Sequence, residues 1–119
     1  MVQPVSQVSG RLDKARHELV KRADGQLASV REGLRRLEGY MTVHVENADA
    51  TEQTHAIQRV HGLVGKAQHA KVKCKAEPES IAISETYIDA VKAAHSALED
   101  AGALLTKLAS RAIEQAVET

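Results

Sequence analysis

Apolar residues recur at steps of three and four from residue 5 to residue 45, and this spacing constrains the fold more than any other feature of the sequence. Residues three and four apart lie on one face of an α-helix, so the spacing predicts one long amphipathic helix over about residues 5–45. The steps resemble a heptad repeat, with a stutter of consecutive fours around Ala23. These apolar positions form a seam that consists of Val5, Val8, Leu12, Ala15, Leu19, Ala23, Leu27, Val30, Leu34, Leu37, Met41 and Val45.

The dipeptide Asp24-Gly25 is the most plausible place for this first helix to break, because Asp-Gly is common in turns. The apolar seam runs across the dipeptide without losing its spacing. We therefore expect a continuous helix, and a four-helix arrangement with a break near Gly25 is the alternative.

Two further segments show helical periodicity. Asp49 and Glu52 have the spacing of a capping box, which predicts a second helix over about residues 50–76. Pro78 then ends this helix, and a third is predicted over about residues 80–118. The seam of the second helix is Ala56, Val60, Leu63, Ala67, Ala70 and Cys74. The seam of the third is Tyr87, Val91, Ala94, Leu98, Ala101, Leu105, Leu108, Ala112 and Ala116.

The lengths of the first and third helices exclude a compact globule. A helix of about 40 residues is about 60 Å long, whereas a compact chain of 119 residues is about 35 Å across. The chain has no Trp or Phe, and a thin core built from Ala, Val, Leu and Ile suits a narrow rod. The predicted fold is all-α: an elongated antiparallel three-helix bundle or coiled-coil rod, formed by one helical domain over residues 1–119.

Composition argues against several classes of protein. The longest apolar runs are far shorter than the roughly 20 residues of a transmembrane helix, so no membrane span is expected. The N-terminus lacks the basic stretch and apolar block of a secretory signal. Cys74 is the only cysteine, which precludes an intrachain disulfide and favours a reducing compartment. The predicted location is cytoplasmic, with signal-less export or incorporation into a virion as alternatives.

Charge is divided unequally along the chain. The net charge is +2 over residues 1–46, +2 over residues 47–77 and −4 over residues 78–119. We expect the acidic third helix to pack beside the two mildly basic ones, and a basic partner-binding face is the alternative. The sequence pI is about 7.0 and no aromatic residues alternate with the basic ones, so a nucleic-acid partner is not expected. Candidates for the basic face are either Arg31, Arg35 and Arg36, or Lys66, Lys71, Lys73 and Lys75.

The six histidines are the residues best suited to catalysis or metal binding, but their spacing does not favour a metal site. No two of them are three or four residues apart, which is the usual separation of paired ligands on a helix. Glu52 and His55 have Glu-x-x-His spacing without a second copy of that motif. The sequence therefore predicts no metal and no cofactor.

The segment His61-Gly62-Leu63-Val64-Gly65-Lys66-Ala67 resembles the phosphoacceptor helix of histidine phosphotransfer domains, which reads His-x-Leu-Lys-Gly followed by two small residues. The resemblance covers this segment alone and implies that His61 accepts a labile phosphoryl group beside a lysine. The sequence departs from the family pattern at Val64, where the family has Lys, and at Lys66, where the family has a small residue. A signalling module that uses His61 is an alternative function.

The size, the single cysteine and the missing signal peptide are similar to those of the helical-hairpin proteins exported by type VII secretion. The Trp-x-Gly turn of that family is absent, and a third long helix is not part of its pattern. A small secreted helical protein, or a component of a virion or filament, is a second alternative.

The sequence predicts a protein that is not an enzyme. It contains no nucleophile constellation and no Gly-rich loop after a strand. We expect a helical interaction or structural protein that acts through helix–helix surfaces, as a homo-oligomer, with a helical protein partner, or both. Apolar residues outside the narrow seams would form the interface, namely Val20, Val43, Val64, Val72, Leu104 and Ile113.

Overall fold

The computed structural model describes the backbone of residues 5–44 and 48–118. Within these ranges it describes the side chains of residues 13–40 and 51–111, together with Ile113, Glu114 and Val117. The chain forms three helices, which are α1 (Val5–His44, 40 residues), α2 (Ala48–Ala76, 29 residues) and α3 (Ile81–Glu118, 38 residues).

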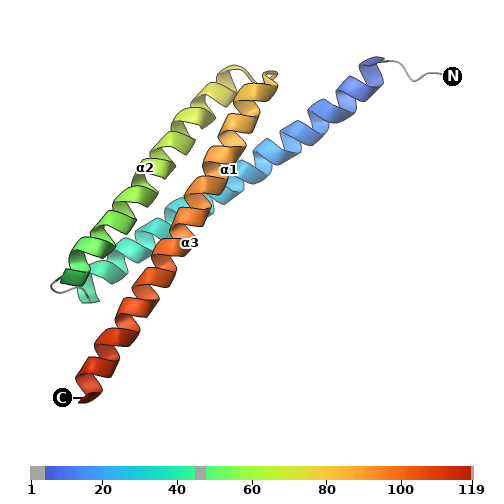
Figure 1. Ribbon diagram of the computed structural model, residues 1–119. Coiled ribbons are helices and arrows are strands. Elements are labelled where there is room, and N and C mark those ends of the chain that lie inside the picture. Colours follow the sequence, from blue (N-terminus) through green and yellow to red (C-terminus); the bar gives the residue numbers. More distant parts are fainter. Residues whose placement is uncertain (1–4, 45–47, 119) are drawn as a thin grey trace.

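The three helices form an elongated bundle in which α2 runs antiparallel to both α1 and α3 (Figure 1). The molecule measures 78 × 27 × 16 Å and its radius of gyration is 19.7 Å, against about 13–14 Å for a compact chain of this length. The predicted all-α, antiparallel three-helix rod is therefore confirmed. Helix α1 continues through Gly25, so the four-helix alternative is wrong.

Helices α1 and α3 are staggered, so each extends beyond the bundle at one end. The N-terminal part of α1 projects past the α2–α3 turn, and the C-terminal part of α3 projects past the start of α2 (Figure 1). Arg16 Nη2 donates a hydrogen bond of 3.1 Å to the carbonyl oxygen of Pro78, which places Arg16 at the level of that turn. We call residues 5–19 the head segment and residues 109–118 the tail segment.

A thin core runs along the centre of the rod and contains mainly small and β-branched side chains. Most predicted seam residues whose side chains are described are buried in it, but Ala15 and Leu19 of α1 are exposed. The seam residues whose side chains lie outside the described residues are Val5, Val8, Leu12, Met41, Val45, Ala112 and Ala116. Helix α2 packs against two neighbours, so it also buries Ile57 and Val64, which lie outside its predicted seam. The buried apolar residues are Ala23, Leu27, Val30, Leu34, Ile57, Val60, Val64, Ala67, Ala70, Cys74, Tyr87, Val91, Ala94, Ala97, Ala101, Leu105 and Leu108.

Helices α1 and α3 are in close contact at Gly33. A Cβ atom on Gly33 would lie 2.7 Å from Cδ2 of Leu98. The missing side chain therefore provides the space that the Leu98 side chain occupies, and this contact fixes which turn of α1 faces which turn of α3.

The ends of α2 and α3 follow from local sequence. The Ser80 hydroxyl accepts a 3.3 Å hydrogen bond from the backbone N–H of Ile83, so Ser80 caps the N-terminus of α3. Helix α2 begins at Ala48, one residue before the predicted cap Asp49, whose side chain lies outside the described residues. Lys73 and Lys75 in the last turn of α2 face the negative end of the helix dipole.

The core assignment predicts that Leu34→Ala and Arg35→Ala differ strongly in stability. Leu34 is 4% exposed, so its truncation should lower the free energy of unfolding by about 2–5 kcal/mol. The Arg35 side chain is 77% exposed, and its loss should cost less than about 0.5 kcal/mol. Urea unfolding of both variants tests this, and equal losses would contradict the core assignment.

The glycines of α1 predict opposite responses to alanine. No atom lies within 4 Å of a Cβ built on Gly25, so Gly25→Ala should raise the free energy of unfolding by about 1 kcal/mol through helix propensity. Gly33→Ala should lack this gain, because its Cβ must displace Leu98. Thermal melts of the two variants compare them directly. A larger gain at Gly33 than at Gly25 would show that the two helices are not in close contact there.

Candidate functional site

Asp24 is the point where side chains of all three helices meet. Tyr87 of α3 donates a hydrogen bond from its hydroxyl to Asp24 Oδ1 at 2.5 Å. Lys75 of α2 donates from Nζ to Asp24 Oδ2 at 3.0 Å, and Lys71 Nζ lies 4.0 Å from Oδ1. This cluster joins a carboxylate of α1 to groups on both neighbouring helices, and we call it the Asp24 junction.

The charge at the junction is stabilised by its partners. Partial burial by itself raises the pKa of Asp24. The hydrogen bonds from Tyr87 and Lys75, with the positive charges of Lys75 and Lys71, outweigh burial and hold the pKa below its ordinary 3.8. Burial, the hydrogen bond to Asp24 and the charge of Asp24 raise the pKa of Tyr87 well above 10.0. The carboxylate is therefore ionised and the phenol protonated at neutral pH.

A second polar contact lies close to the junction inside the core. Cys74 is 3% exposed and Ser84 is 1% exposed, and their Sγ and Oγ atoms lie 3.8 Å apart. The thiol is enclosed between α2 and α3 instead of facing solvent. This environment is that of a packed structural cysteine.

A groove of about 600 Å³ runs between α2 and α3. Lys66, His69 and Lys73 line it from α2, at positions that share one helix face, while Ile83 and Ala90 line it from α3. None of the three basic side chains forms an ion pair within the described part of the chain. The groove therefore combines an apolar lining with cationic groups.

The structure divides the lysines that the sequence grouped as one candidate basic face. Lys66 and Lys73 line the groove, whereas Lys71 and Lys75 face Asp24. Their spacing along α2 indicates this division. Residues 66 and 73 are seven apart and residues 71 and 75 are four apart, so the members of each pair share one helix face. The sequence did not show which neighbour each pair faces.

His61 lies on the surface of α2 and contacts a carboxylate. Its side chain is 56% exposed, and its Nε2 atom pairs with Oε1 of Glu38 in α1. Lys66, the lysine of the segment that resembles phosphotransfer domains, lines the groove between α2 and α3. The environment of His61 thus contains an acidic neighbour at its Nε2 atom.

The predicted interface residues lie in different environments. Val64 is 7% exposed and belongs to the intramolecular core, so it is not available to a partner. Val20 and Leu104 are half-buried, and Val20 packs against the core. Val72 and Ile113 are 69% and 66% exposed. The side chain of Val43 lies outside the described residues.

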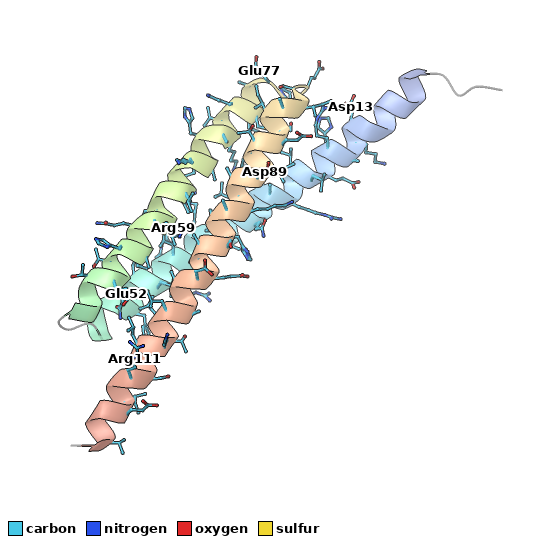
Figure 2. All side chains as sticks on the ribbon, in the orientation of Figure 1. Asp13, Glu52, Arg59, Glu77, Asp89 and Arg111 are labelled. Atoms are coloured by element: carbon cyan, nitrogen blue, oxygen red, sulfur yellow. The ribbon has the colours of Figure 1, made fainter. Side chains whose placement is uncertain are left out.

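The tail segment of α3 carries two large apolar side chains that the bundle leaves uncovered. Ile113 is 66% exposed and Val117 is 81% exposed, and their spacing of four places them on one helix face. Leu108 is the last buried residue described in α3. In Figure 2, Glu52 marks the start of α2, and Arg111 lies on the part of α3 that extends beyond it.

The described residues contain no group of three or more His, Cys, Asp or Glu side chains arranged to hold a metal ion. Among these residues, no helix combines the length and the apolar character needed to cross a membrane.

Comparison with known proteins gives no relative from which a function can be transferred. No protein-family model, no curated protein and no solved structure matches this chain significantly.

The Asp24 junction predicts a pH-dependent contribution to stability. Asp24→Asn should lower the free energy of unfolding at neutral pH by about 1.5–3 kcal/mol, because hydrogen bonds to a charged carboxylate are lost. The folded pKa is lower than the unfolded one, so the wild-type advantage is complete above about pH 4 and is lost as pH falls through the folded pKa.

Urea unfolding of Asp24→Asn and wild type between about pH 6 and about pH 3 measures this effect. Glu32→Gln is the matched control, because Glu32 is 54% exposed and forms only surface ion pairs with Arg35 and Arg36. A loss at Asp24 that does not shrink toward acidic pH would show that the charge is not stabilised by the junction.

Proposed function

We propose that this protein is a non-enzymatic helical interaction protein that self-associates through helix–helix surfaces. The observation that carries the proposal is the pair of exposed apolar side chains, Ile113 and Val117, on a helical segment that projects from the bundle. Their surface lies beyond the intramolecular core, and a second helix packed against it would remove it from water.

The energetics of the tail segment support a partner. Burying a large aliphatic side chain contributes about 1.5–3 kcal/mol, so this pair offers a substantial gain to an associating helix. The last turns of a helix that project without tertiary packing are held only by their own helical hydrogen bonds, since most helical stability in proteins comes from packing. Association would stabilise the helix of the tail segment and cover its apolar face.

The polar groups of the chain are consistent with a structural role. Asp24, Tyr87 and Lys75 pair with one another across the three helices, which leaves no free acid–base pair at the junction. At His61, the Glu38 carboxylate pairs with Nε2 and would repel an incoming phosphoryl group. These contacts favour an interaction protein over a phosphotransfer module.

Self-association predicts that solution mass and stability depend on protein concentration. Light scattering should give a mass above the 12.9 kDa of the single chain, and this mass should rise with concentration. The melting temperature should rise as well, because a partner that binds only the folded state stabilises it. A mass of one chain and a concentration-independent melt would contradict the proposal.

The phosphotransfer alternative has a separate test. Incubation with acetyl phosphate should leave the protein unlabelled. Labelling that His61→Gln abolishes would show phosphoacceptor activity and would contradict the assignment of a purely non-enzymatic role.

A further inference from the structure

We propose that the head segment of one copy packs against the tail segment of the next, so that the rods assemble head to tail. This inference rests on the proposed self-association and names the two surfaces that meet. It assigns the covering of the exposed α3 face to residues 5–19 of a second copy.

The stagger of α1 and α3 supplies two free ends of similar length. Asp24 pairs with Tyr87 and Gly33 lies against Leu98, so residues about 64 apart in sequence lie at the same level of the rod. With this offset, α1 begins about 12 residues before α3, which corresponds to about 18 Å of helix. Helix α3 ends about 10 residues after α1, which corresponds to about 15 Å.

The direction of the helices lets the two ends meet without a turn. Helices α1 and α3 run the same way along the rod, and their free ends lie at opposite ends of the molecule (Figure 1). A second copy placed along the axis therefore brings its head segment beside the tail segment of the first. The new contact repeats the parallel α1–α3 packing that already exists within one chain.

Both segments carry apolar residues at helical spacing, and the large ones whose side chains are described are exposed. Leu19 belongs to the apolar seam of α1 but is 48% exposed, and Ala15 one turn earlier is also exposed. The same spacing continues toward the N-terminus at Val5, Val8 and Leu12. On the tail segment, Ile113 and Val117 present the complementary face. An apolar stripe on each partner is what helix–helix packing requires.

The charges of the two segments are of opposite sign. The net charge is +1 over residues 5–19 and −1 over residues 109–118. Lys14 and Glu114 are exposed, and neither forms an ion pair within the described residues. Two tail segments would repel each other weakly, whereas a head and a tail attract. Charge therefore favours the head-to-tail pairing over a symmetric tail-to-tail dimer.

Because the two contacting surfaces differ, the interface is heterologous. Such an interface forms a ring when the rotation between copies closes and an open chain when it does not. Copies that repeat along the rod axis do not close, so the expected assembly is linear and each added copy exposes a new free end.

The experiment uses two complementary variants of the full chain. The head variant, Val8→Glu with Leu19→Glu, keeps an intact tail, and the tail variant, Ile113→Glu with Val117→Glu, keeps an intact head. Each variant alone should give the mass of one chain by light scattering where wild type forms larger species. An equimolar mixture should form a two-copy species and stop there, because only one productive junction remains.

Matched controls separate this inference from loss of folding and from the proposed function. Ala93→Glu adds a charge at an exposed residue in the middle of α3, away from both ends of the rod, and should assemble as wild type does. Far-UV circular dichroism should show that all variants stay helical. If wild type assembles but the head variant also assembles, or the mixture stays at one chain, the head-to-tail inference is wrong while self-association stands. A wild type that remains a single chain at all concentrations overturns both.

Discussion

The Asp24 carboxylate is the interaction on which the arrangement of the three helices depends. It accepts hydrogen bonds from Tyr87 of α3 and Lys75 of α2, so one residue of α1 contacts both neighbours. Apolar seams alone permit helices to slide past each other, because any turn of an aliphatic stripe packs about as well as the next. A partly buried charge with directed partners does not permit this sliding. The junction, with the close approach at Gly33, therefore fixes the stagger of α1 and α3.

The stagger of α1 and α3 determines which apolar surfaces of the molecule stay exposed. If α1 and α3 were flush, their apolar stripes would cover each other along the whole rod. Displaced as they are, the helices leave Ile113 and Val117 uncovered where α3 extends past the end of α1. The groove between α2 and α3 adds a cationic surface that the core does not use. The exposed apolar face of the tail segment thus arises from the offset between α1 and α3, whereas the groove lies between α2 and α3.

Prediction of the candidate site from sequence was partial for identifiable reasons. Ile113 and Val64 were both predicted as interface residues because they lie outside the narrow seams. The structure leaves Ile113 exposed but buries Val64. A helix with two neighbours buries a wider stripe than a helix with one, and the sequence does not state the number of neighbours. Val117 was not predicted, although it lies four residues after Ile113 and next to the seam residue Ala116. The pairing of Asp24 with Tyr87 joins residues 63 positions apart and left no periodic signal.

The sequence by itself determined the number and the approximate bounds of the helices, because these depend on local spacing and on Pro78. It also determined that the chain forms a rod, since helices of 40 and 38 residues exceed the width of a compact domain. Only the tertiary structure decided the stagger of α1 and α3, the division of the α2 lysines between junction and groove, and the apolar residues left exposed. These depend on the relative rotation and translation of packed helices, which contacts between residues distant in sequence determine.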